Sequence, residues 1–336
     1  RSRSRGRRAA EEGQQQQQQQ ECGALLLGAP HLDRHQARQI ACGWQHCLVL
    51  THVGAVFSWG FGGYGALGHG VKYSRKEPQV VDALLGRLVL SVACGSYASS
   101  AVTTEGRLYT WGWGRSGILG QGSTRNEMSP REVRMCFAEE PLPPAVKCAM
   151  GHEHMLVLTR KGDLFSCGNG SSGRLGYVGA REEWLLRRVK TAANGEELSW
   201  INDVACGYAH SAIIDSHGRL LTCGQGAHGA LGHENFEDQF YFVCVLGLPR
   251  QVKKVACGGF FTACILAAGG TGEDGTVVTC NEVWTFGRNE YQQLGRKCVR
   301  KERFRNDPEL LEAATSHPNF VRLVAEEPEE KEKEKE

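Results

Sequence analysis

A frame of glycines recurs along this chain and constrains its fold more than any other feature. The frame is 26 residues long, and it begins without a gap at Gly43, Gly95, Gly151 and Gly207. In each copy, four further glycines stand 11, 17, 22 and 25 residues after the first. All twenty positions are glycine, although glycine makes up only 43 of the 336 residues. Such agreement excludes a compositional accident and predicts a repeat architecture.

A fifth copy runs from Gly258 through Gly287 to Gly295, with a twelve-residue insertion and with Gln292 in place of the fourth glycine. The period is 51 to 56 residues. Between the glycines, the residues alternate in the two-residue rhythm of strands. In the first copy, strands are expected at 47–50 and 56–59 and are joined as a hairpin. A further strand is expected before the first glycine of a copy, as at 88–94 before Gly95.

A fourth strand is expected at the edge of each sheet, as at 78–81, where Pro78 is tolerated. A lone sheet of four strands cannot bury both faces, so several must pack radially. The sequence therefore predicts an all-β fold, a β-propeller with five clear four-stranded blades. The propeller is expected over residues 22–324, between a disordered Arg/Ser- and Gln-rich tail (1–21) and a charged Glu/Lys tail (325–336).

Several short motifs accompany the glycines. Ala-Cys-Gly stands at 41–43, 93–95, 205–207 and 256–258, and a histidine follows the glycine by three residues at His46, His154 and His210. Trp-Gly stands at 59–60 and 111–112, and Leu-Gly closes every copy. The combination resembles the regulator of chromosome condensation repeat family, over roughly residues 38 to 324. That resemblance implies a propeller of seven blades, against which five clear repeats are incomplete.

A light-sensing branch of that family is similar, but it clusters tryptophans through a repeated Gly-Trp-Arg-His-Thr pattern. Here the residues after the first glycines are Trp44, Ser96, His152, Tyr208 and Gly259, and Gln45 stands where the arginine would be. The pattern therefore does not favour light sensing by that route.

Rival chemical sites are not favoured by the residues. The glycine-rich stretch 60–65 lacks the Gly-Lys-Ser/Thr and the helix pattern of a phosphate loop. The repeated histidines are expected to bond a neighbouring backbone group, and the cysteines at 42, 94, 206 and 257 are expected to be small buried hydrophobes. His46 and Cys47 alternate to opposite faces of a strand, so they form no nucleophile and base pair. We expect no cofactor, no metal site and no catalytic centre.

Composition adds limits to this interpretation. The formal net charge is +2, so no bulk field selects nucleic acid or a membrane, and direct nucleic-acid binding is left open. No apolar run approaches the roughly 18 residues of a membrane span. The fourteen cysteines fall inside repeated apolar runs, so we expect reduced thiols and an intracellular protein, cytoplasmic or nuclear.

Binding specificity on a rigid scaffold usually resides in its loops. A basic segment at 296–305 offers candidate partner-binding residues, alternatively a solvated loop: Arg296, Lys297, Arg300, Lys301, Arg303, Phe304 and Arg305. The leading hypothesis is a non-catalytic interaction propeller that binds a protein partner such as a small GTPase or a chromatin protein. The resemblance also implies guanine-nucleotide exchange on a Ran-like GTPase, with Glu273 and Asp274 as wedge candidates. A third hypothesis is the targeting module of a larger ubiquitin ligase.

Overall fold

The computed structural model describes residues 36–179, 181–198, 200–268, 282–295 and 319–321. These residues form five four-stranded antiparallel sheets, each made of four consecutive strands. The predicted all-β class and four-stranded blades are confirmed, and the predicted strands differ from the observed ones by a few residues at their ends. Within the part of the chain that the structure describes, there is no apolar helix of membrane-spanning length.

The strands have the following bounds. The first blade is β1 (Ala37–Cys42), β2 (His46–Thr51), β3 (Val56–Gly60) and β4 (Arg75–Val80). The second is β5 (Val89–Cys94), β6 (Ala98–Thr103), β7 (Leu108–Gly112) and β8 (Glu127–Val133), and the third is β9 (Ala145–Met150), β10 (His154–Thr159), β11 (Leu164–Asn169) and β12 (Glu182–Val189). The fourth is β13 (Asp203–Cys206), β14 (His210–Ile214), β15 (Leu220–Gly224) and β16 (Gln239–Cys244). The fifth is β17 (Val252–Cys257), β18 (Phe261–Leu266), β19 (Glu282–Gly287) and β20 (Asn319–Val321).

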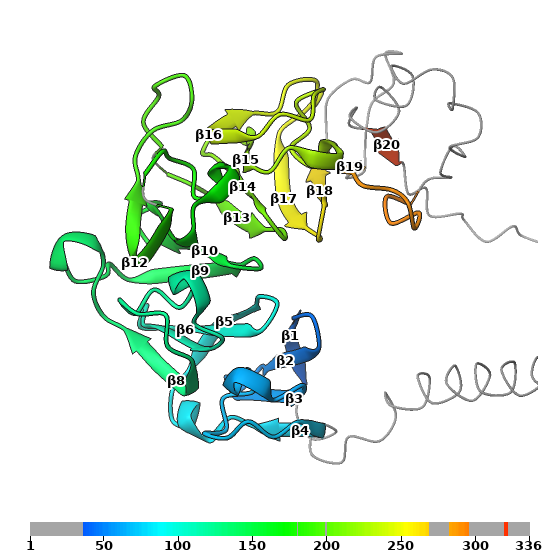
Figure 1. Cartoon of the computed structure of the whole chain (residues 1–336). Coiled ribbons are helices and arrows are strands. Elements are labelled where there is room, and N and C mark those ends of the chain that lie inside the picture. Colours follow the sequence, from blue (N-terminus) through cyan, green and yellow to red (C-terminus); the bar gives the residue numbers. More distant parts are fainter. Residues whose placement is uncertain (1–35, 180, 199, 269–281, 296–318, 322–336) are drawn as a thin grey trace, which may run out of the picture.

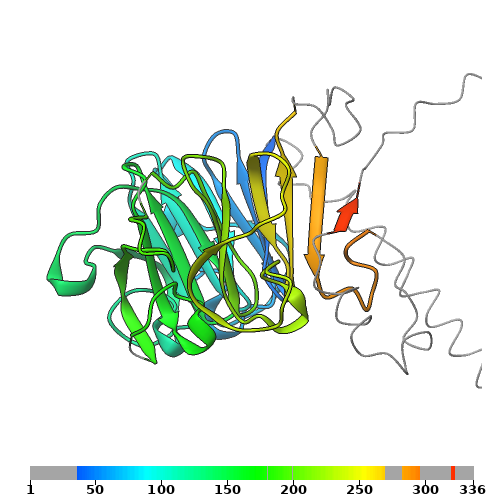
Figure 2. The same cartoon turned by 90° about the horizontal axis from the view of Figure 1, so that it is seen from above.

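The blades are arranged around a common centre. Figure 1 shows the first strand of each blade toward the centre and the fourth toward the periphery. The inner strands β1, β5, β9, β13 and β17 contact one another in this order. The blades form an arc that is open between its first, blue end and its fifth, yellow to orange end (Figure 1). In the turned view of Figure 2 the five blades share one layer.

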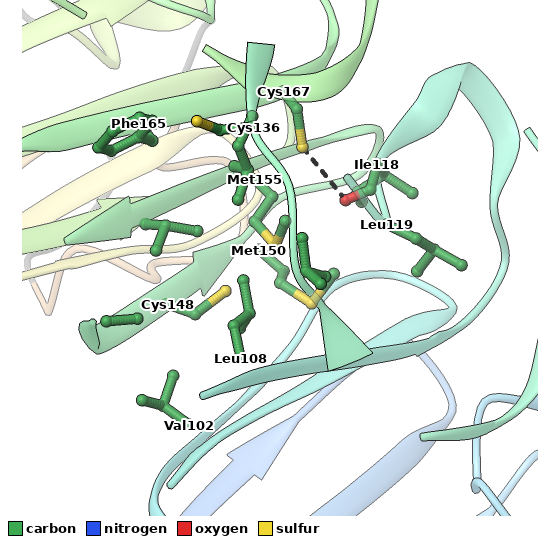
Figure 3. Packing of buried hydrophobic residues seen from close by; sticks show 14 of the residues in the cluster. Val102, Leu108, Ile118, Leu119, Cys136, Cys148, Met150, Met155, Phe165 and Cys167 are labelled. Carbon is green, nitrogen blue, oxygen red and sulfur yellow. Dashed lines mark hydrogen bonds between the residues drawn. The ribbon is translucent and has the colours of Figure 1, made fainter. Parts of the chain in front are cut away.

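The hydrophobic core lies between neighbouring blades. Between the second and third blades, Leu108 and Ile118 pack with Met155 and Phe165, and all four side chains are buried. Figure 3 shows this cluster, in which the Cys167 thiol lies 3.6 Å from the Ile118 carbonyl oxygen. Each blade thus buries the apolar faces of its strands against its neighbours, as expected of repeats that cannot bury them alone.

The repeated glycines stand where the backbone bends or approaches another chain segment. Gly168, the second-last residue of β11, has a φ of +108°. A Cβ there would lie 2.2 Å from the carbonyl oxygen of Glu153. Gly151, before the hairpin turn, has an ordinary φ, but a Cβ would lie 2.5 Å from the Gly207 carbonyl oxygen of the next blade. Gln292 takes the left-handed conformation of the glycines that it replaces, with φ 59°. The first glycine of the frame is therefore required by packing, and the later ones also by conformation.

A buried hydroxyl holds the bend after the third strand in all five described blades. It stands one residue before the Trp, Cys or Phe that precedes the frame glycine, and its oxygen donates a hydrogen bond to the carbonyl of the leucine in the Leu-Gly pair. The bonds measure 2.7 to 2.9 Å and are Ser58–Leu67, Thr110–Leu119, Ser166–Leu175, Thr222–Leu231 and Thr285–Leu294. Each bond satisfies a buried polar pair that would otherwise cost free energy.

The repeated histidines link neighbouring blades, but not through the predicted backbone group. The Nε2 atom of His46 lies 2.9 Å from the Ser99 hydroxyl, and His154 and His210 contact Ser211 and Thr262 at 3.0 Å. Each hydroxyl in turn donates to a backbone carbonyl, as Ser99 does to Ala66. With the hydroxyl proton used in this way, the histidine Nε2–H must be the donor to the hydroxyl. The structural role was predicted correctly, and the partner was predicted wrongly.

The buried histidines make stability depend on pH. Burial lowers the pKa of His210 to about 4, from an unfolded value of 6.5. The unfolded chain therefore binds this proton more readily, so stability falls as the pH falls from about 6.5 toward 4. We expect His210→Gln, which can still bond Thr262, to reduce the loss of unfolding free energy between pH 6.5 and 5.5 by about 1 kcal/mol. Urea unfolding at the two pH values measures this difference.

The control for this prediction is His52→Gln, because the His52 side chain is exposed. That variant should keep the pH dependence of the unchanged protein. An equal change of slope in both variants would show that the buried imidazole is not its source.

Candidate functional site

One end of the blades collects aromatic side chains from all five repeats. In each antiparallel blade, the loop between the first two strands and the loop after the third strand lie at the same end. Nine rings of the described residues lie in these loops and contact one another in a continuous series. We call this set the aromatic surface: Trp44, Phe61, Tyr64, Tyr97, Trp113, His152, Tyr208, His228 and Phe260.

The part of the aromatic surface on the first two blades is densely packed. The ring centroids of Trp44 and Tyr97 lie 5.7 Å apart in a stacked arrangement. Tyr97 also meets the edges of Phe61 at 5.7 Å, Tyr64 at 5.5 Å and Trp113 at 5.9 Å. Stacked and edge-to-face pairs at these separations are favourable beyond the area that they bury. The rings therefore hold one another in place.

The other part crosses the third, fourth and fifth blades. Trp113 contacts His152 at 5.6 Å, and His152 stacks on Tyr208 with centroids 4.3 Å apart and an interplanar angle of 11°. Tyr208 contacts Phe260 at 5.2 Å, and Phe260 contacts His228 at 5.4 Å. The series thus joins loops that are more than 200 residues apart in the chain, from Trp44 to Phe260.

Backbone hydrogen bonds between blades fix the loops that carry these rings. The Trp44 amide donates to the Ser96 carbonyl at 3.1 Å, and the His152 amide donates to the Tyr208 carbonyl at 3.3 Å. The Tyr208 amide donates to Gly259 at 2.9 Å. Because the loops are tied to one another as well as to their own blades, the aromatic surface is built on a preorganised scaffold, which lowers the cost of binding.

Several of the rings are open to solvent. Trp44 is 62% exposed, Tyr64 is 40% exposed and Tyr208 is 36% exposed, and the other rings, apart from the exposed His228, are half-buried. Contiguous exposed aromatic area of this kind typically marks an interaction site on a soluble protein. Tryptophan and tyrosine are also the residue types that dominate binding energy at protein interfaces.

Charged side chains border the rings. The Arg115 guanidinium lies 5.6 Å from the centre of the Trp113 ring, and its Nε lies 3.3 Å from a Glu153 carboxylate oxygen. Arg288 lies 5.7 Å from the Phe260 ring and pairs with Glu290. His152 itself contributes little charge at neutral pH, because burial lowers its pKa from 6.5. The surface therefore offers ring faces with arginine and glutamate at its borders.

The structure does not describe the partner-binding residues that were predicted from the sequence. Glu273, Asp274 and the seven candidates between Arg296 and Arg305 lie outside the described residues. Their proposed roles stay predictions. Conversely, the aromatic surface was not predicted from the sequence. Its signal was present in the aromatic and histidine residues one or two places after the first frame glycine, which are Trp44, Tyr97, His152, Tyr208 and Phe260.

The repeated cysteines require one correction. Cys94 and Cys206 are half-buried, and each lies 3.4 Å from a carbonyl oxygen of the preceding blade. Cys257 is also half-buried, whereas Cys42 is exposed. The expectation that all four are buried was therefore wrong for Cys42, which stands in the first blade of the arc, and it was only partly met by the three half-buried thiols. The eleven cysteines of the described ranges are free thiols.

Known proteins share this repeat. The family model described as regulator of chromosome condensation (RCC1) repeat matches residues 53–102, 105–158, 161–214 and 217–265. The ultraviolet-B receptor UVR8 of Arabidopsis thaliana is 32% identical over 265 residues, which cover 79% of this chain and 56% of that protein. Human E3 ubiquitin-protein ligase HERC2 is 33% identical over 270 residues, which cover 79% of this chain and 5% of that protein.

The fold is also found in solved structures. Prp20p of Saccharomyces cerevisiae superposes with a TM-score of 0.65 at 22% identity, over 85% of this chain and 65% of that one. Human WBSCR16 gives the same TM-score and identity, over 85% of this chain and 67% of that one. This chain spans little more than half of UVR8 and a small part of HERC2. The repeat matches, the relatives and the blades agree, and the chain belongs to the regulator of chromosome condensation (RCC1) repeat family.

Proposed function

We propose that this propeller is a non-catalytic interaction module that binds a protein partner through the aromatic surface. The observation that carries the proposal is the continuous series of rings across five described blades, with Trp44, Tyr64 and Tyr208 open to solvent. A related propeller supports a protein as the partner. Prp20p of Saccharomyces cerevisiae has binding properties to Gsp1p and histones, and Kap60 has been solved bound to the same protein.

The aromatic surface suits a partner that offers apolar or planar groups. Its exposed rings supply large contact area at a low cost in side-chain entropy, because each has only two side-chain torsions. The arginines and glutamates at its borders can then select among partners by charge. Neither feature requires a reacting group on the propeller.

We expect the triple variant Trp44→Ala, Tyr64→Ala, Tyr208→Ala to weaken partner binding by about 30-fold or more, since truncation of aromatic anchors removes the main binding energy. Crosslinking of the tagged chain in cell lysate, followed by quantitative mass spectrometry and titration of the recovered protein, measures this loss. The control is Phe137→Ala, Trp200→Ala, Leu246→Ala, which truncates three exposed apolar side chains in the loops at the opposite end of the blades.

The control variant should retain the partner. Equal retention by both variants, at unchanged thermal stability, would contradict the proposed surface. Loss only in the control would move the interface to the opposite end.

Guanine-nucleotide exchange on a Ran-like GTPase is the contrasting hypothesis, and the same preparations test it. Release of labelled GDP from Ran, accelerated by the purified chain and abolished by Glu273→Ala with Asp274→Ala, would replace the non-catalytic hypothesis. The third hypothesis is that the chain is the targeting module of a ubiquitin ligase. Its support is the similarity to HERC2, because HERC2 is named as a ubiquitin-protein ligase.

A further inference from the structure

Two thiols face each other across the first hairpin. Cys42 at the end of β1 is the direct cross-strand partner of Cys47 in β2. Their sulfur atoms lie 3.7 Å apart, and both residues are free thiols. Cys42 is exposed and Cys47 is half-buried, so reagents in solution can reach the pair.

The backbone at this site has the spacing that a disulfide needs. The neighbouring pair, Gly43 and His46, is joined by a hydrogen bond of 2.8 Å from the Gly43 amide to the His46 carbonyl. The next pair along an antiparallel ladder is then a non-hydrogen-bonded one, whose Cα atoms stand about 4.5 Å apart. Disulfides span Cα separations of roughly 4.4 to 6.8 Å. Side-chain rotation can therefore bring the two sulfur atoms to bonding distance without moving the strands.

The other four described blades lack this pair. At the two equivalent positions they carry Cys94 with Ser99, Met150 with Met155, Cys206 with Ser211 and Cys257 with Thr262. In three of those blades the second position holds the hydroxyl that contacts a histidine side chain of the preceding blade and donates a hydrogen bond to a backbone carbonyl of that blade. In the first blade that position is Cys47, and its thiol is directed to Cys42 instead.

We propose that Cys42 and Cys47 are an oxidation site, at which glutathione disulfide or another small disulfide converts the two thiols into one reversible intramolecular disulfide. The Cys42 thiolate attacks one sulfur of glutathione disulfide, the S–S bond breaks, and one glutathione leaves as its thiolate. The Cys47 thiolate then attacks the Cys42 sulfur of this mixed disulfide and releases the second glutathione. Overall, the two cysteines lose two electrons and two protons, and glutathione disulfide is reduced to two molecules of glutathione.

Exposure and the hydrogen bond set the order of these steps. Cys42 is the exposed member, and the Cys47 thiol donates its hydrogen bond to the Cys42 sulfur. Burial, together with this hydrogen bond, raises the pKa of Cys47 to about 11. Cys42 is thus the attacking thiol and Cys47 the resolving one. The disulfide would close the turn that carries Trp44, but the site does not depend on the proposed partner.

The full chain, reduced and then freed of reductant, is incubated with glutathione disulfide and its mass and peptides are measured. We expect the loss of two hydrogen atoms without retained glutathione, and cleavage after Trp44 should leave two peptides joined through Cys42 and Cys47. Dithiothreitol should separate them. In Cys47→Ser the reaction should stop at one glutathione on Cys42, because the resolving thiol is absent.

Cys257→Ser is the matched control, since Cys257 occupies the equivalent position opposite Thr262. It should form the same crosslink as the unchanged chain. Three results would overturn the proposal: Cys42 and Cys47 remain free thiols, each of them retains glutathione, or either forms a crosslink to another cysteine.

Discussion

Gly168→Ala is expected to lower the free energy of unfolding by about 3 kcal/mol. The left-handed backbone costs an alanine about 1 to 2 kcal/mol. In addition, a Cβ at Gly168 would lie 2.2 Å from the Glu153 carbonyl oxygen and 2.7 Å from the His154 Cα, both of which belong to the backbone. Backbone cannot rotate away as a flexible side chain can, so the strands must separate. Urea unfolding followed by circular dichroism measures the loss.

Gly195→Ala separates the two causes. Gly195 also has a positive φ, +82°, but a Cβ there would meet nothing within 4 Å. This control should cost only about 1 kcal/mol, which is the conformational part. Equal losses in the two variants would show that the close approach of β10 and β11 contributes nothing.

These two glycines illustrate what the sequence could predict. Gly168 belongs to the frame that recurs in four registers, and the recurrence alone identified a bend shared by all blades. Gly195 lies outside the frame, and a turn in a connecting loop explains it. A repeat pattern therefore reports the constraints that every blade shares, and strands, bends and blade length could all be derived from it.

Interactions between blades were harder to predict. The register of His154 indicated a repeated structural role, but its partner Ser211 belongs to the next blade, 57 residues away. Sequence periodicity gives the position of a residue within a blade, and not the side chain that faces it across the interface. The same limit explains Cys42, which shares its register with Cys94. Burial depends on a neighbouring blade as well as on register.

The aromatic surface shows why the candidate site escaped the sequence. Its rings are spread from Trp44 to Phe260, and they become neighbours only when the blades are arranged around one centre. Each ring alone is an ordinary loop residue. The prediction that binding resides in loops was general enough to include these rings. The segment 296–305, however, was chosen by its positive charge, and it lies outside the described residues.

Trp111→Ala is expected to produce the largest loss of stability, about 4 kcal/mol, which is the usual cost of truncating a buried tryptophan. Trp111 is fully buried between the first and second blades, where it packs with Leu48 and Tyr109. Its Nε1 donates a hydrogen bond of 2.9 Å to the Ala66 carbonyl. Because that carbonyl also accepts the Ser99 hydroxyl at 2.8 Å, the truncation leaves no orphaned acceptor. The loss should therefore come from the cavity, and urea unfolding followed by circular dichroism measures it.

Trp59→Ala is the control at the same position of the first blade, where the tryptophan is only half-buried. We expect this variant to lose about 2 kcal/mol, because the area removed from the core is smaller. Trp111→Phe should recover most of the stability lost in Trp111→Ala, since it refills the cavity and forfeits only a hydrogen bond whose acceptor keeps a partner. A Phe variant as unstable as the Ala variant would mean that the indole hydrogen bond, and not the packing between blades, holds this interface together.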